Sequence, residues 1–185
     1  FAPWRKPRNE SASWVTSSGR MYLVDGLWPS ALNASRYWMA IVFWSTSLAD
    51  WKTLDELKVP KKGGKFVLSW SWHPKALPLA VPSATLHMAA MRGMDVTVVR
   101  PDGFELPPEV MEKARKGAAL SGGSVRETND RADAYEGAHV IYAKEWSSTR
   151  HYGDRVADQK LREQLQDWIV DEPSFAKAQP SARFM

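Results

Sequence analysis

Short apolar runs alternate with longer mixed stretches over residues 63–172. Most of these runs are rich in Val, Ile, Leu, Phe or Trp and are bounded by turn residues, which is typical of buried strands. The turn Lys61-Lys62-Gly63-Gly64, for example, precedes the first run. The pattern predicts strands over residues 65–70, 95–99, 124–127, 139–143 and 168–170.

The stretches between these runs carry helix signals at their ends. Pro107-Pro108 begins one of them, and proline fits the first turn of a helix because the N–H that it lacks has no partner there anyway. Gly93 and Gly137 follow two others, and glycine commonly ends helices. The predicted helices cover residues 78–91, 107–120, 131–136, 158–166 and 172–178.

Strand and helix therefore alternate at the spacing that crossover connections require. Strands that are apolar on both faces belong to parallel sheets whose two sides are both covered by helices. We predict an α/β fold, a three-layer sandwich with a Rossmann-like parallel sheet and helices on both faces.

The first part of the chain has a different character. Residues 1–47 are rich in Trp, Ser and Arg, and their apolar residues follow no period of 2 or 3.6. A short buried helix over 32–44 is one interpretation, although Tyr, Trp, Ile and Val are mediocre helix formers. We predict a poorly specified N-terminal segment over 1–47, disordered or unrelated to the rest, and a domain over 48–185.

Composition and charge exclude several classes of protein. The 185 residues are 44% hydrophobic and 25% charged, which excludes wholesale disorder, and no apolar run is long enough for a membrane span. The absence of Cys excludes disulfides and a thiol nucleophile. The formal net charge of +4 comes without a Lys/Arg block, so we expect no nucleic-acid partner. The first residues lack the apolar region of a secretory signal, and we expect a cytoplasmic protein.

Ligands of open parallel sheets bind beyond the carboxyl ends of the strands. The loops predicted there are 71–75, 100–103 and 144–154. The first lacks the G-x-G-x-x-G spacing of dinucleotide sites, which makes nucleotide binding a disfavoured alternative. The remaining histidines lack the spacing of metal ligands, so we expect neither a metal nor another cofactor.

Three residues in these loops are candidates for substrate binding. His73 could contact a ligand, or it could only fix the turn before Pro74. Lys144 directly follows an apolar run and could offer a charged donor to a carboxylate, or it could be a solvated strand end. Trp146 could form the wall of an apolar pocket or simply cover the sheet.

Several segments resemble one family, the N-acetylornithine carbamoyltransferases of the aspartate/ornithine carbamoyltransferase superfamily. The likeness is to the second, amino-substrate-binding domain and extends over about 48–185. It is carried by KFVLSWSWHPK at 65–75, GMDVTV at 93–98, SGGS at 121–124, AYEGAHVIYAKEW at 134–146 and WIVDE at 168–172.

The resemblance implies transfer of the carbamoyl group of carbamoyl phosphate to the δ-amine of N-acetyl-L-ornithine, in arginine biosynthesis. Lys144 matches the family's substrate-binding Lys, which pairs with the α-carboxylate, and His73 matches the loop His near the amino substrate. The acyl group, acetyl or succinyl, stays open. A non-catalytic module that binds acylated basic amino acids is the alternative.

The 185 residues lack the family's first domain with its Ser-x-Arg-Thr phosphate loop, and they end before its His-Cys-Leu-Pro loop. We therefore expect the isolated chain to be inactive and to use carbamoyl phosphate only together with that domain. The family forms homotrimers, and without the first domain we do not expect this assembly.

Overall fold

The computed structural model describes residues 12–17, 20–25 and 48–185. The chain divides into two compact units, Phe1–Val42 and Phe43–Met185. In the first unit, β1 (Ala12–Ser17) and β2 (Arg20–Asp25) pair as an antiparallel hairpin. The sequence pattern predicts neither strand, because their apolar residues do not alternate cleanly. The helix predicted over 32–44 lies outside the described residues.

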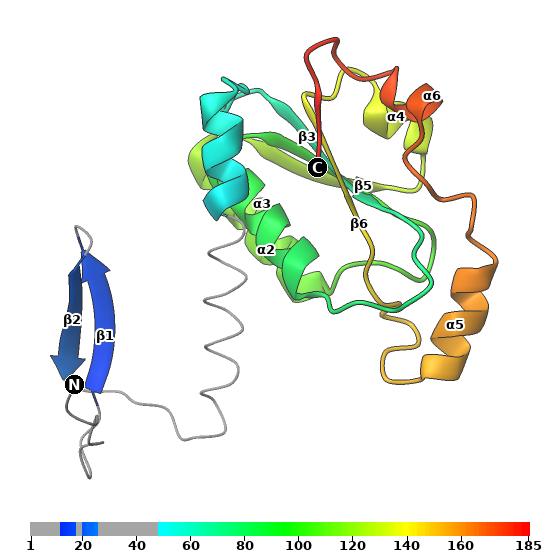
Figure 1. Cartoon of the computed structure of the whole chain (residues 1–185), viewed down its shortest axis with the longest axis horizontal. Helices are drawn as coiled ribbons and strands as arrows, with labels where there is room; N and C mark the ends of the chain where they lie inside the picture. Colours follow the sequence, from blue (N-terminus) through cyan, green and yellow to red (C-terminus); the bar gives the residue numbers. More distant parts are fainter. Residues whose placement is uncertain (1–11, 18–19, 26–47) are drawn as a thin grey trace, which may run out of the picture. The chain divides into compact units, whose positions relative to one another are not determined.

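The second unit is built on a five-stranded sheet (Figure 1). The strand order is β5-β4-β3-β6-β7, and every neighbouring pair is parallel. This confirms the predicted α/β fold with a parallel sheet. The strands are β3 (Lys65–Trp70), β4 (Asp95–Val99), β5 (Ser124–Thr128), β6 (Val140–Lys144) and β7 (Arg183–Phe184).

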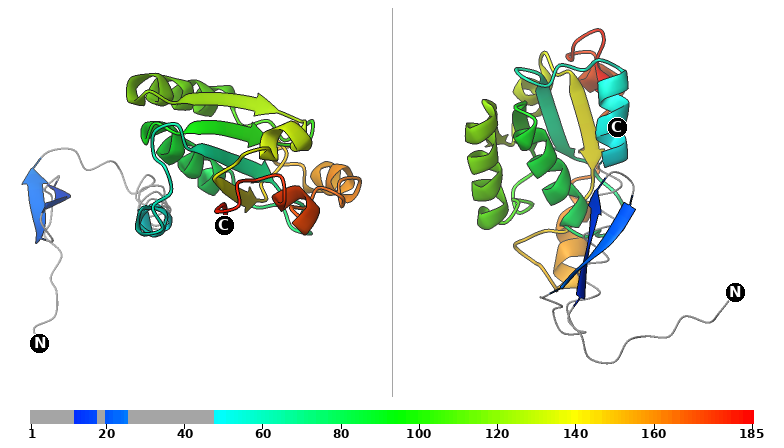
Figure 2. Two further views of the ribbon diagram at one scale, coloured as in Figure 1. Left: turned by 90° about the horizontal axis from the view of Figure 1, so that it is seen from above. Right: turned by 90° about the vertical axis from the view of Figure 1, so that its left-hand side faces the viewer.

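Helices cover both faces of this sheet (Figure 2). The helix over residues 48–56 packs on the same face as α2 (Ala80–Met91) and α3 (Pro108–Ser121), and all three contribute to one core. The short helices α4 (Arg131–Tyr135) and α6 (Glu172–Phe175) pack on the other face. None of the described helices has both the length and the apolar content needed to cross a bilayer.

The central strand β3 shows why most of its residues are apolar. Phe66 and Leu68 point into the core beneath α2 and α3, whereas Val67 points into the core beneath α4. All three side chains are fully buried. Because successive side chains of a strand point to opposite faces, the interior positions of a strand covered on both sides are buried on either face.

The strand predicted over 168–170 is wrong. These residues form no strand, and Trp168 and Val170 instead pack their side chains against the core that contains Val67. The strand that pairs with the outer edge of β6 is β7, which the sequence pattern did not predict. Directly after β7, the Met185 N–H donates to the Ile141 carbonyl at 3.0 Å.

The helices predicted over 158–166 and 172–178 have different bounds in the structure. α5 (Arg155–Glu163) starts earlier than predicted because the Asp154 carboxylate accepts hydrogen bonds from the N–H groups of Val156 and Ala157. Such a side-chain cap fixes the first turn of a helix. α6 ends at Phe175, and the chain continues in turns toward β7.

Candidate functional site

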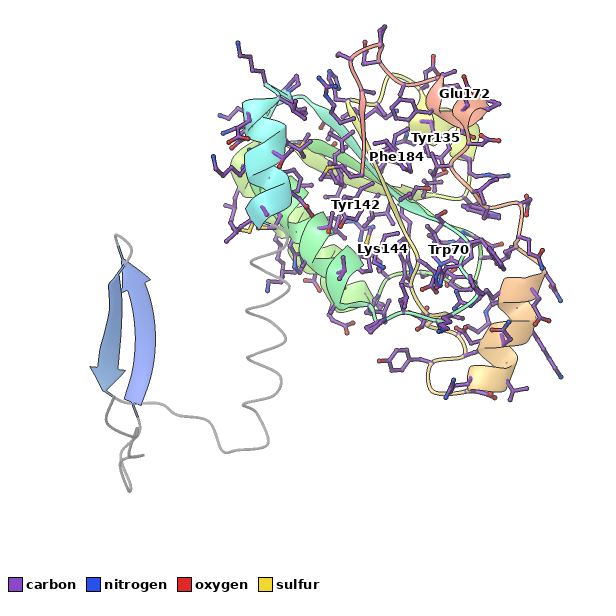
Figure 3. All side chains as sticks on the ribbon, viewed as in Figure 1. Trp70, Tyr135, Tyr142, Lys144, Glu172 and Phe184 are labelled. Atoms are coloured by element: carbon purple, nitrogen blue, oxygen red, sulfur yellow. The ribbon has the colours of Figure 1, made fainter. Side chains whose placement is uncertain are left out.

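The order of the strands reverses at β3 and β6, so the carboxyl ends of these two strands are the expected ligand-binding position. From β3 the chain moves outward through β4 to β5, and it then returns to the other side of β3 as β6. Such a reversal is a topological switch point, where open α/β sheets bind their ligands. Trp70 at the end of β3 is the register partner of Lys144 at the end of β6, and Figure 3 shows both at the same end of the sheet.

Lys144 is half-buried and is the last residue of β6. Tyr142 packs against the core beneath α2, and alternation along the strand places Lys144 on the same face. The Lys144 carbonyl accepts a hydrogen bond from the Ser71 N–H at 3.2 Å, so its backbone is joined directly to the loop after β3.

His73 lies in that loop with an exposed side chain. Its Nδ1 lies 3.1 Å from the backbone N–H of Lys75, which donates to it. The ring therefore braces the turn around Pro74, which is one of the two predicted roles. This contact engages Nδ1 and leaves Nε2 as the nitrogen for a ligand, so substrate contact by His73 stays a prediction.

Trp146 is fully buried. Its indole nitrogen donates to the Phe104 carbonyl oxygen at 2.9 Å, and its own carbonyl accepts from the Trp70 indole nitrogen at 3.0 Å. The side chain thus covers the end of the sheet, as in the second of its two predicted roles. Direct contact with a substrate stays a prediction.

Sequence reasoning missed a buried group of charges beside these residues. Glu145, Asp158 and Arg162 are all buried, and Arg162 has no exposed surface at all. One guanidinium nitrogen of Arg162 donates to Asp158 at 2.5 Å, and another donates to Glu145. We call these three residues the Arg162 cluster.

Aromatic rings and burial set the electrostatics of the Arg162 cluster. The guanidinium carbon of Arg162 lies 5.7 Å from the centre of the Phe104 ring and 6.0 Å from that of Trp70, within the range of cation–π attraction. Burial raises the pKa of the Glu145 carboxyl, and the Arg162 charge partly offsets this rise. Two carboxylates thus share one guanidinium in a water-poor environment.

The Arg162 cluster joins the three loops that the sequence predicts at the ligand-binding end. Glu145 accepts a hydrogen bond from the Leu77 N–H in the loop after β3, at 2.7 Å. Asp158 accepts one from the Ser148 N–H in the loop after β6, also at 2.7 Å. The Ser148 hydroxyl in turn donates to the Gly103 carbonyl in the loop after β4, at 2.6 Å.

Little in the sequence could have revealed this cluster. Asp158 and Arg162 are spaced i, i+4 on a predicted helix, but such pairs are common on exposed helix faces. Glu145 follows the candidate Lys144, where a charged residue is equally compatible with a solvated loop. Their burial depends on how three distant loops pack together.

The described residues offer no evident metal site. No group of three or more His, Asp or Glu side chains in these parts of the chain is arranged to hold a metal ion. What the loops after β3 and β6 do offer is an ammonium group, an imidazole and backbone groups, which suit a small anionic or polar ligand.

Comparison with known proteins identifies what this arrangement is similar to. Residues 80–185 match the family model described as aspartate/ornithine carbamoyltransferase, Asp/Orn binding domain. A relative from Xanthomonas campestris pv. campestris, N-acetylornithine carbamoyltransferase, is 40% identical over 116 residues, which are 62% of this chain and 34% of the relative. The N-succinylornithine carbamoyltransferase of Bacteroides thetaiotaomicron is 29% identical over 130 residues, 70% of this chain and 36% of that protein.

Solved structures give the same result. A crystal structure of acetylornithine transcarbamylase complexed with acetylcitrulline superposes with a TM-score of 0.65 at 36% sequence identity. The match covers 71% of this chain and 40% of that chain. This chain therefore spans well under half the length of the relatives that it matches.

Proposed function

Because this chain belongs to the aspartate/ornithine carbamoyltransferase family through its Asp/Orn binding domain, we propose that it binds N-acetyl-L-ornithine or a close analogue. Its role would be the amino-substrate side of carbamoyl transfer from carbamoyl phosphate to the δ-amine, a step of arginine biosynthesis. The matched relatives are much longer, and we assign no phosphate-binding role to these residues. The cytoplasmic location expected from the sequence stays a prediction.

The position of Lys144 at the switch point is the observation that carries this proposal. The residue ends β6 beside the end of β3, where parallel sheets bind ligands. An ammonium group there can form a charge-assisted hydrogen bond with the α-carboxylate of an amino acid. His73, in the neighbouring loop after β3, is the second residue that we propose contacts the substrate.

The chemistry of the reaction fits a divided site. A neutral amine must attack the carbamoyl carbon, and the attack gains most when the binding site fixes the amine in a productive position. Anchoring the α-carboxylate at Lys144 would fix one end of the ornithine side chain. The δ-amine, at the other end, would then be presented to the carbamoyl group. Donors for the developing oxyanion and for phosphate would come from groups outside the site described above.

Titration calorimetry with N-acetyl-L-ornithine tests the proposal. We expect saturable binding to the unmodified chain and binding about ten- to 150-fold weaker in Lys144→Ala, because a hydrogen bond to a charged group contributes about 1.5–3 kcal/mol. Lys113→Ala, which removes an exposed lysine of α3, should bind like the unmodified chain. N-succinyl-L-ornithine in a parallel titration reports the preferred acyl group.

Two results would refute the proposal: no binding by the unmodified chain, or equal binding by Lys144→Ala. A colorimetric assay for ureido products separates binding from turnover. With carbamoyl phosphate and N-acetyl-L-ornithine present, we expect no product from these 185 residues alone.

A further inference from the structure

We propose that Glu145 is a positioning residue of the amino-substrate site. Its carboxylate, held by Arg162, fixes the loop that carries His73 against the end of β6 that carries Lys144. This inference rests on the proposed function. Glu145 contacts the backbone of the site, whereas Lys144 and His73 are the residues proposed to contact the substrate.

The loop after β3 is attached to the β6 side at both of its ends. At its start, the Ser71 N–H donates to the Lys144 carbonyl. At its end, the Leu77 N–H donates to Glu145, and the Leu77 carbonyl accepts from both the N–H and the hydroxyl of Ser147, at 2.9 and 2.7 Å. His73 lies between these two attachments, so the position of its backbone depends on both.

Arg162 makes this attachment rigid. The side chain of Glu145 is only 3% exposed and that of Arg162 is 0% exposed. Arg162 is held on its other side by Asp158 and lies beside the rings of Trp70 and Phe104, whose centres are 4.6 Å apart. Since the guanidinium is planar and its donors have fixed directions, it determines how the Glu145 carboxylate is oriented.

The same pair of side chains reaches both predicted site residues. Glu145 directly follows Lys144 in the chain, so a shift of its backbone moves that lysine. A guanidinium nitrogen of Arg162 also lies 3.5 Å from the His73 carbonyl oxygen. The pair therefore connects the backbones of His73 and Lys144, which lie about 70 residues apart in sequence.

Stability alone does not account for a buried group of two carboxylates and one guanidinium. Desolvation of buried charges offsets much of their attraction, and well-packed apolar residues are often as stable or more so. What the charges add is a defined direction for each hydrogen bond. At Glu145 that direction is toward the Leu77 N–H, at the end of the loop that holds His73.

The test compares Glu145→Met, which keeps the volume of the side chain but removes the acceptor, with Glu145→Gln, which keeps an oxygen for the Leu77 N–H. Hydrogen–deuterium exchange of the Leu77 amide reports the loop, and calorimetry with N-acetyl-L-ornithine reports the site. Circular dichroism selects conditions in which each variant is folded. Glu112→Ala, which removes an exposed carboxylate of α3 paired with Lys116, is the matched control.

In Glu145→Met we expect the Leu77 amide to exchange at least about tenfold faster than in the unmodified chain. We also expect the variant to bind N-acetyl-L-ornithine at least about tenfold more weakly. Glu145→Gln should restore most of the exchange protection and most of the affinity, and the Glu112→Ala control should change neither quantity. Rescue by the conservative variant distinguishes positioning from a general loss of stability. Unchanged exchange in Glu145→Met, or unchanged affinity despite faster exchange, would overturn the inference.

Failure of Glu145→Met to fold, and failure of the unmodified chain to bind, each have a defined consequence for the inference. If Glu145→Met does not fold, Arg162→Lys replaces it, because lysine keeps the charge but lacks the planar donors that orient the Glu145 carboxylate; faster Leu77 exchange and weaker binding are then the expected results, and wild-type values refute the inference. If the unmodified chain binds no ligand, the proposed function fails, while Leu77 exchange in Glu145→Met still decides whether Glu145 holds the loop.

Discussion

The Trp70 indole nitrogen donates a hydrogen bond to the backbone carbonyl oxygen of Trp146, 3.0 Å away, and both side chains are fully buried. The bond joins the end of β3 to the residue that follows Glu145. Because neither group is accessible to water, each has to be satisfied within the protein.

Trp70→Phe is expected to destabilise the chain by about 1–3 kcal/mol, because the Trp146 carbonyl loses its buried donor. Chemical unfolding in urea, followed by circular dichroism, measures the change. Trp168→Phe is the control, since Trp168 is only partly buried and packs edge-on against Trp70 with ring centres 6.3 Å apart. A smaller loss of stability in Trp70→Phe than in the control would contradict this account.

Gly122 and Gly123 are expected to respond differently to the same substitution. Gly122 ends α3 with φ +84°, and a side chain added there meets no atom within 4 Å. A Cβ added to Gly123 would lie 2.3 Å from the Met94 carbonyl oxygen. Gly122→Ala therefore carries only the cost of a left-handed backbone, about 1–2 kcal/mol, whereas Gly123→Ala must displace the backbone at Met94, directly before β4.

We expect Gly123→Ala to be the more destabilising of the two in thermal or urea unfolding. The comparison has an internal control, because both variants add one methyl group to the same connection. Equal stabilities would show that the approach of Gly123 to Met94 is not a constraint on the fold.

The pH dependence of stability should include a contribution from Asp50. Burial raises the pKa of this carboxyl above its usual 3.8, and the neighbouring Tyr142 hydroxyl partly offsets the rise. A carboxyl with a raised pKa in the folded state contributes stability below its unfolded pKa and loses it as the pH rises through the folded pKa. Asp50→Asn should therefore be more stable than the unmodified chain at pH 7, and the difference should shrink as the pH is lowered toward 4.

Urea midpoints between pH 4 and pH 7 measure this difference. Asp55→Asn on the same helix gives the contrast, because Asp55 pairs with Arg92 and Lys61 and its removal should not raise stability. A difference between Asp50→Asn and the unmodified chain that grew on acidification would contradict the assigned direction of the pKa shift.

Much of the sheet could be predicted from local pattern. β3, β4 and β6 are apolar on both faces, and parallel strands covered by helices on both sides are the arrangement that buries such sequences. The segment 168–170 has the same apolar character but forms no strand. A short apolar run indicates burial, and the pattern alone does not distinguish backbone pairing at a sheet edge from side-chain packing on its face.

The place of the candidate site could also be predicted, because it follows from topology. Once β3 and β6 are parallel neighbours, Lys144 at the end of β6 and His73 after the end of β3 must lie at the same edge of the sheet. The burial of Glu145 and Arg162 could not be predicted in this way. It results from contacts among loops far apart in the sequence, and no local pattern records which of several charged residues will be enclosed.

The central position of β3 has a consequence for the order in which the molecule assembles. One side of β3 pairs with β4, about 30 residues later in the chain, whereas the other side pairs with β6, about 75 residues later. During synthesis the pairing of β3 with β4 can form early. The other edge of β3 stays unpaired until the polypeptide has been extended past residue 144. The ligand-binding end of the sheet therefore cannot be completed until Arg162 has been synthesised.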